Sequence, residues 1–208
     1  MTTHHLPRPR TAFAGVAVVA AWSAWQPADI TTWWMEAIPA LIGLPLAWLC
    51  WGRYPWTRLA AWAMALHAVI LLVGAHYTYA LTPLGFWLQD AFDFSRNHYD
   101  RIGHLAQGFF PAILAREVIH RGTGLQGRWL AFLATCFCLA FSALYELIEW
   151  WAALALGAGA DAFLATQGDP WDTQWDMFLA LCGAILAQLF LAARHNQQLA
   201  ALLRRAPH

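Results

Sequence analysis

The chain has 208 residues, of which 60% are hydrophobic and 12% are charged, and its mean hydropathy is +0.44. Soluble domains usually carry about 25% charged residues, so a water-soluble fold is excluded, because it would have too little polar surface to cover the apolar side chains. The formal net charge is +0, and no overall electric field therefore favours nucleic acid or a strongly charged partner.

Successive apolar stretches predict an all-α fold, a polytopic transmembrane bundle of about six helices. Their approximate limits are residues 11–26, 33–52, 59–81, 101–120, 129–157 and 175–194. A helix needs roughly 20 residues to cross the hydrocarbon core, so most of these stretches are long enough to span a membrane. Breaks containing Pro, Gly and Arg separate them. No internal repeat divides the chain, which is interpreted as a single transmembrane domain over residues 1–208.

The distribution of arginine predicts which way the helices run. The chain has no lysine, so its twelve basic residues are all arginine. With the N-terminus in the cytoplasm, ten of them fall on the cytoplasmic side, and Arg96 and Arg101 alone fall outside. This asymmetry follows the positive-inside rule. It predicts a multi-pass protein of the bacterial cytoplasmic (inner) membrane with its N-terminus and C-terminus in the cytoplasm.

Ionisable residues inside the predicted helices are candidates for a functional site, because a charge in hydrocarbon costs roughly 2.5–3.5 kcal/mol on insertion scales. Glu146 and Glu149 lie three residues apart in the fifth apolar stretch, and this spacing puts both carboxylates on one helical face. Counted from Trp129 at about 1.5 Å per residue, Glu146 is roughly 25 Å along the helix. The pair is therefore expected in the outer part of the membrane.

The fourth and sixth helices bring further acids and an imidazole to the same depth. Asp100 and His104 are four residues apart at the outer start of one, and Asp172 and Asp176 are four apart at the outer start of the other. Each pair shares a helical face. The third helix brings His76 to this level as well. Because the topology places these groups at one depth, we predict a shared site formed by Asp100, His104, Glu146, Glu149, Asp172 and Asp176.

Several kinds of chemistry fit such a cluster. Carboxylates with an imidazole can hold a divalent cation, act as a general acid and base, or bind and pass a cation or proton. Arg96 and Arg101 lie beside Asp100 in the sequence, where they either neutralise the acids or bind an anionic head group or phosphate. The structural alternative is a buried network that only holds helices together. For a metal, the predicted ligands are His104, Glu146, Glu149 and Asp176.

Polar residues at the inner ends of the helices are given no functional role. Arg116 and Glu117 are interpreted as the end of the fourth helix, and His195 as the inner end of the sixth. Strongly polar residues are expected not to continue into the inner halves of the fourth, fifth and sixth helices. This expectation disfavours a transporter, because a conducting path needs polar groups along its length.

Three stretches of the sequence, residues 92–108, 145–150 and 168–176, resemble the YjdF-type inner-membrane protein family, and the resemblance covers most of the chain. More distantly, the order Asp-x3-His, Glu-x2-Glu and Asp-x3-Asp is similar to VanZ-like membrane proteins. Glu149 and Ala180 stand where that pattern has Gln and Asn. The resemblance implies a polytopic bacterial membrane protein and supports the six candidate residues as a functional set. It implies no reaction.

The leading functional hypothesis is an inner-membrane protein with an outward-facing Asp/His/Glu site. This site is expected to bind or process a lipid-linked or anionic envelope component, with the lipid bilayer as the surroundings and a divalent cation as the candidate cofactor. One alternative is a transporter of a small cation or proton. Another is a structural subunit whose polar cluster only joins helices. No nucleic acid partner is expected.

Reporter fusions test the predicted orientation. A reporter active only in the periplasm, fused within residues 121–128, is expected to be inactive, because the arginines of this connection hold it in the cytoplasm. The same reporter fused within residues 93–98 serves as the control and is expected to be active. Activity of the first fusion would reverse the topology and separate the candidate residues in depth.

Overall fold

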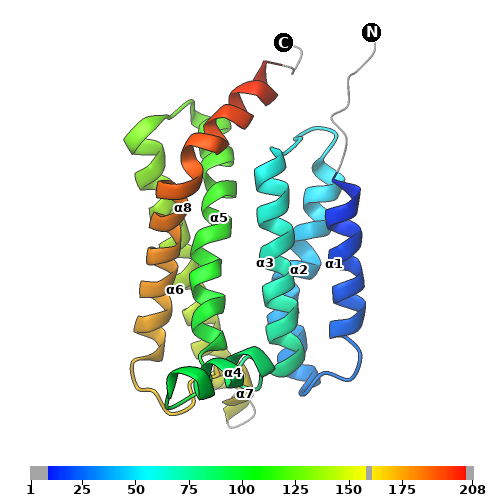
Figure 1. Ribbon diagram of the computed structural model, residues 1–208, viewed down its shortest axis with the longest axis vertical. Coiled ribbons are helices and arrows are strands. Elements are labelled where there is room, and N and C mark those ends of the chain that lie inside the picture. The colour runs from blue at the N-terminus through cyan, green and yellow to red at the C-terminus, as the bar shows by residue number, and fades with distance from the viewer. Residues whose placement is uncertain (1–8, 158–160, 205–208) are drawn as a thin grey trace.

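Six long helices make up most of the described chain, residues 9–157 and 161–204 of a computed structural model. They are α1 (Arg10–Ser23), α2 (Ile30–Cys50), α3 (Arg58–Tyr77), α5 (Tyr99–Thr123), α6 (Gly127–Leu156) and α8 (Asp172–Leu203). They run alternately in opposite directions, so the start of α1 and the end of α8 lie at the same end of the bundle (Figure 1). The predicted all-α transmembrane bundle is confirmed.

The outer surface of the bundle suits a lipid environment. Within the described residues, α2, α3, α6 and α8 are each long and apolar enough to cross a membrane. Helix α1 has 14 residues, which at about 1.5 Å each span less than the roughly 30 Å hydrocarbon core. Helix α5 is long enough, but it carries more charged residues than α2, α3, α6 or α8. Large apolar side chains point outward, and Leu154, Leu189 and Phe190 are each about 70% exposed. Lipid is the solvent that such a surface requires.

Two short helices lie in connections that the sequence analysis left without structure. Helix α4 (Pro83–Phe92) begins with proline at its first position, where the missing N–H costs no hydrogen bond. It ends at Asp93 in the left-handed conformation. Helix α7 (Asp161–Leu164) and α4 both lie at the end of the bundle opposite the start of α1 (Figure 1). Both are too short to produce a transmembrane signal.

The predicted limits of two long helices are wrong by several residues. Helix α3 stops at Tyr77 rather than at residue 81, because Thr78 and Tyr79 adopt left-handed φ values of 57° and 53°. Helix α8 continues to Leu203, beyond the predicted limit of residue 194. Its last turns are held by burial of Leu199 and by the side chain of Gln198, whose Oε1 accepts a hydrogen bond from the backbone N–H of Leu59 at 2.8 Å. Tertiary contact thus extends the helix past the apolar run.

Small residues let α5 pack closely against α8, and Figure 1 shows these two helices side by side. A Cβ atom on Gly108 of α5 would overlap the carbonyl oxygen of Ala180, and one on Gly183 of α8 would overlap that of Leu105. Such close backbone approach through small residues is typical of transmembrane helix pairs, since lipid supplies little hydrophobic driving force between helices. Because α5 and α8 each carry candidate site residues, this packing sets the distance across the site.

The aromatic ring of Tyr79 occupies the space that two glycines leave between α3 and α5. A Cβ on Gly74 would overlap the ring, and one on Gly103 would lie 2.8 Å from its Cε1 atom. The Tyr79 side chain is buried and also makes an edge contact with the ring of Tyr99. The left-handed turn at the end of α3 therefore aims this ring back into the bundle.

The close contact between α5 and α8 can be tested with alanine. Gly108→Ala is expected to destabilise the protein by about 1–3 kcal/mol, because the added methyl group has no space beside Ala180. The measurement is the thermal unfolding temperature in detergent. Gly122→Ala is the matched control, since Gly122 lies in the same helix and a Cβ there meets no atom within 4 Å. An equal effect of both changes would contradict close packing.

Candidate functional site

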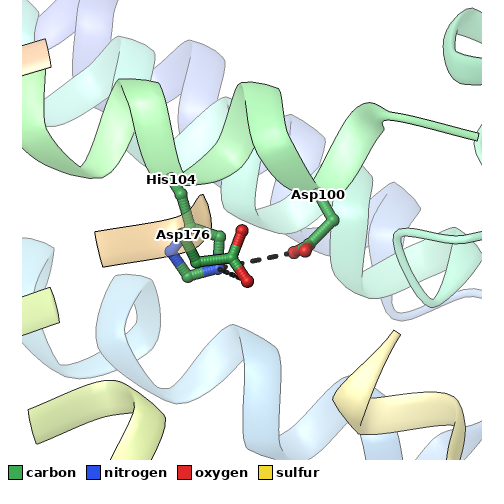
Figure 2. Close-up of side chains that lie close together, drawn as sticks. All are labelled: Asp100, His104 and Asp176. Atoms are coloured by element: carbon green, nitrogen blue, oxygen red, sulfur yellow. Dashed lines mark ion pairs between the residues drawn. The ribbon is translucent and has the colours of Figure 1, made fainter. Parts of the chain in front are cut away.

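The first two turns of α5 and α8 and the second half of α6 bring four of the six predicted site residues together, three of them around the imidazole of the fourth, His104. His104 and Asp100 project from α5, and Asp176 projects from α8 toward them (Figure 2). Glu146 reaches the same imidazole from α6. All four side chains are buried, with exposed fractions from 2% to 7%.

The two nitrogens of His104 face different groups. Nε2 lies 3.5 Å from Asp100 Oδ1 and 3.9 Å from Asp176 Oδ2. Nδ1 lies 3.0 Å from the side-chain oxygen of Gln107 and 3.8 Å from Glu146 Oε1. An amide oxygen only accepts hydrogen bonds, so Nδ1 carries the hydrogen and donates it to Gln107. The lone pair of Nε2 in the neutral ring then faces two carboxylates, an arrangement that requires a proton or a cation between them.

Glu149, the second acid of α6, lies at the edge of this cluster and is half-buried. One ligand atom each from His104, Glu146 and Glu149 lie within 4.8 Å of one another. The same limit holds for one atom each from Asp100, His104 and Asp176. The residues therefore form two overlapping sets of potential metal ligands that share the imidazole.

The predicted site residue Asp172 forms an ion pair with Arg96 at 2.5 Å, and both side chains are buried. Arg96 also donates a hydrogen bond to the backbone oxygen of Thr166. Arg101 pairs with Asp169 at 2.6 Å and lies over the ring of Trp175. The two outer arginines thus tie the start of α5 to the segment before α8, and their charges are matched by acids outside the imidazole cluster.

His76, which the topology also brings to this level, turns toward another part of the bundle. Its Nδ1 lies 3.0 Å from the backbone oxygen of Ser23, and its ring lies against that of Trp22 at the end of α1.

At the start of α5, burial lowers the pKa of His98, and the charges of Arg101 and Arg96 lower it further. His98 is therefore neutral at pH 7 and adds no positive charge near the acids.

Glu36 of α2 is a buried member of the site that the sequence analysis missed. Its carboxylate accepts a hydrogen bond from the hydroxyl of Tyr145 on α6 at 3.2 Å. The signal was present, because Glu36 is an ionisable residue inside a predicted span, the same property that identified Glu146. Gln107 carried no comparable signal, since an amide in a transmembrane helix is less unusual than a charge.

A small cavity of about 30 Å³ lies inside the site. This volume exceeds what one water molecule needs, and therefore also accommodates a single metal ion. Its polar lining comes from four helices and the turn after α3, namely Glu36, His67, Tyr79, Asp100, His104, Gln107, Tyr145 and Glu149. The cavity thus brings the polar groups of distant segments to one small space.

Two carboxylate oxygens of the site lack hydrogen-bond partners within the described part of the chain. They are Glu146 Oε1 and Asp176 Oδ1, and both are buried. A buried acceptor without a partner costs roughly 1–3 kcal/mol, and more when it is charged. The three acids that line the cavity also outnumber its two imidazoles, those of His67 and His104. The site is therefore short of positive charge and of hydrogen-bond donors.

A second polar cluster lies at the opposite ends of α5 and α8, where none was expected. Glu117 is fully buried and accepts hydrogen bonds from the backbone N–H and hydroxyl of Thr57, from Arg121 and from His195 Nε2. The expectation that strongly polar residues stop before the inner halves of these helices is wrong. Glu117 lies inside α5 because its donors converge from α3, α5 and α8.

The neighbouring Arg116 is buried as well, and it donates hydrogen bonds to the side-chain oxygens of Gln188 at 2.5 Å and Asn196 at 2.7 Å. Its interpretation as a helix end is also wrong, since α5 continues to Thr123. The cluster around Glu117 supplies several donors to its carboxylate, whereas the cluster around His104 leaves two carboxylate oxygens without any among the described residues. The first arrangement stabilises a fold, and the second is typical of a ligand site.

Multi-pass membrane proteins with a polar site at one end of the bundle are the class that this fold and site define. Residues 8–197 match the family described as "Predicted membrane protein (DUF2238)". The chain is 54% identical to the inner membrane protein YjdF of Escherichia coli (strain K12) over 172 aligned residues, and this alignment covers 82% of each chain. The chain therefore belongs to the DUF2238 family of membrane proteins, as the resemblance predicted. No solved structure matches it.

The contrast between the two clusters can be tested with the same substitution in each. Glu117→Gln is expected to lower the stability by about 2–3 kcal/mol, because it removes charge-assisted hydrogen bonds. Glu146→Gln is expected to leave the stability unchanged or raise it, because it removes a buried charge whose Oε1 atom has no hydrogen-bond partner among the described residues. Thermal unfolding of both variants in the same detergent provides the measurement. A comparable loss in both would show that the outer cluster also serves mainly to hold the helices.

Proposed function

We propose that the chain binds a divalent cation between Asp100, His104 and Asp176, at the outer face of the inner membrane, with both termini in the cytoplasm. The cation would bind or process the polar head of a lipid-linked or anionic envelope component. One observation carries the proposal: His104 Nε2 lies 3.5 Å and 3.9 Å from oxygens of two buried carboxylates, those of Asp100 and Asp176. Three acceptors that face one another need a positive charge between them.

The separations within the cluster fit ligands that share one ion. Two atoms bound to one tetrahedral metal, each at about 2.1 Å, lie about 3.4 Å apart. His104 Nε2 is 3.5 Å from Asp100 Oδ1 and 3.9 Å from Asp176 Oδ2, so both separations lie within about half an ångström of this value. The hydrogen bond from Nδ1 to Gln107 fits the outer contact that metal-bound histidines usually make.

Glu146 lies on the Nδ1 side of the same imidazole, Glu149 lies within 4.8 Å of both, and the two acids leave two roles open. They supply further oxygen ligands, or they accept a proton from a water molecule that the cation activates. Glu146 Oε1 has no hydrogen-bond partner within the described residues, which favours a group that acts on a bound molecule. In either role the acids compensate the charge of the cation, and the cation in turn attracts an anionic head such as a phosphate.

The second candidate is transport of a small cation or proton, and the inner cluster around Glu117 and His195 favours it. Between the two clusters, however, the buried residues of α5 and α8 are apolar, for example Ala112, Ile113 and Ala184. The carboxylate of Glu117 is also fully occupied by donors. Ion flux into proteoliposomes, abolished by His104→Ala, would support transport over binding or processing at the outer face.

The proposed cation site predicts a bound metal in the purified protein. Elemental analysis is expected to find about one divalent cation per chain, as for a single closed site, and His104→Ala is expected to remove it. Chelation should lower the unfolding temperature, since a ligand at 100 times its Kd stabilises by about 2.7 kcal/mol. His104→Ala should lose this response to the chelator while the protein still accumulates in the membrane.

His120→Ala is the control, because His120 belongs to the same helix but lies at its opposite end. This variant is expected to keep both the metal and the response to chelation. Metal content that is absent from the native protein, or equal in both variants, would overturn the proposed cation site.

A further inference from the structure

An apolar cavity of about 370 Å³ lies next to the polar site, between the two halves of the bundle. Figure 1 shows α1, α2 and α3 on one side and α5, α6 and α8 on the other. Both halves line the cavity, and the lining is almost entirely hydrocarbon and aromatic; it includes Gly43, Met64, His67, Phe110, Phe137 and Phe141. Its volume lies within the range of about 300–1,000 Å³ that is usual for small-molecule sites.

This cavity and the small polar cavity share part of their walls. Pro39, His67, Leu71 and Phe141 line both of them. The apolar space therefore ends where the space around Asp100 and His104 begins. From there it runs along α3 toward Trp56, at the end of the bundle opposite the polar site. A molecule that fills both spaces has a polar head at the outer end and a long apolar body.

Two of the helices that line this cavity do not pack closely against each other. Among the described helices, α2 packs on α3, and α6 packs on α5 and α8, whereas α2 and α6 make no comparable contact with each other. Both nevertheless line the cavity, α2 through Gly43 and α6 through Phe137. The hydrogen bond from Tyr145 to Glu36 crosses between these helices at the level of the polar site. Below this bond the cavity is partly open, and the surrounding medium is hydrocarbon.

We propose that this cavity binds the hydrocarbon chain of a membrane amphiphile, which enters from the bilayer between α2 and α6. Its phosphate head lies at the cation between Asp100, His104 and Asp176; this part rests on the proposed function. The apolar walls select a hydrocarbon chain rather than a polar solute, and the continuity with the polar cavity selects a molecule with a head and a tail. A soluble peptide is disfavoured, because its backbone would find no hydrogen-bond partners along these walls.

A second apolar cavity, of about 400 Å³, provides an internal comparison. It lies between α1 and α2 and is lined by apolar residues such as Val16, Leu41 and Leu49. It has the size to take a chain, but its lining contains no ionisable residue. Lipid that fills any exposed groove should enter both cavities, whereas an amphiphile bound through head and tail should favour the first.

Photolabelling with hexadecyl phosphate that carries a diazirine near the end of its chain tests the proposal. The protein is reconstituted in phosphatidylcholine vesicles, labelled and digested, and the modified peptides are quantified by mass spectrometry. Labelling is expected on residues of the cavity beside the polar site, such as Met64 and Phe110, in excess of labelling at Val16 and Leu49. Equal labelling of both cavities would overturn the proposal.

Gly43→Phe should block the chain, because Gly43 lines the cavity and a Cβ there meets no atom within 4 Å, so the ring fills space without displacing a neighbour. Labelling of the cavity is expected to fall about tenfold, the effect of excluding roughly two methylene groups. Gly15→Phe is the control, since Gly15 is a mid-helix glycine with equally open surroundings and does not line this cavity.

Chelation separates this inference from the proposed function. If both Gly43→Phe and chelator reduce labelling, the chain site and the cation site both stand. If Gly43→Phe alone reduces it, the chain site stands and the cation site falls. If the chelator alone reduces it, or if Gly15→Phe acts as strongly as Gly43→Phe, the chain site is overturned. Hexadecanol with the same diazirine should label the cavity without any response to the chelator, because it lacks the phosphate.

Discussion

The scarcity of water inside a lipid bilayer is the constraint on which the rest of this structure depends. Every buried charged group must find its hydrogen-bond donors or its counter-charge within the protein. At one end of the bundle, Glu117 meets this requirement with donors from Thr57, Arg121 and His195. At the other end, one oxygen each of Glu146 and Asp176 has no hydrogen-bond partner among the described residues. The two ends of the bundle thus differ in how fully their buried carboxylates are hydrogen-bonded.

Close backbone packing makes the outer arrangement possible. The imidazole of His104 is held between groups from three helices, and two of these, α5 and α8, approach closely at Gly108 and Gly183. The ion pair of Arg96 with Asp172 ties the segment before α5 to the first residue of α8. The distance between Asp100 and Asp176 is therefore set by rigid contacts on both sides. A site that is short of positive charge can persist only in such a rigid frame, because mutual repulsion would otherwise separate its acids.

Much of the fold was predictable because lipid imposes a simple rule on sequence. Apolar runs marked the six long helices within the described chain, and the alternation of helices then placed acids of separate spans at one depth. The limits of α8 were not predictable in this way. They depend on Gln198, whose partner Leu59 lies 139 residues away in the sequence. Helix ends that rest on such distant contacts leave no local signal.

The candidate site was predictable from ionisable residues in apolar runs, but its detailed composition was not. Asp172 shares a helical face with Asp176, yet its carboxylate pairs with Arg96, and only the fold of the segment before α8 decides between these partners. Glu36 carried the same signal as Glu146 and belongs to the site through Tyr145. Glu117 was given no functional role because it lies near a predicted helix end, yet its side chain is fully buried. Depth can be read from hydropathy, whereas side-chain partners require the packing.

The ring of Tyr79 links the spacing of the helices to the shape of the site. It fills the gap beside Gly74 and Gly103, and its buried side chain is also part of the cavity wall beside His104. The width of the cavity therefore depends on the separation of α3 from α5. Movement of α3 away from α5 would thus widen the cavity and loosen the surroundings of the imidazole at the same time.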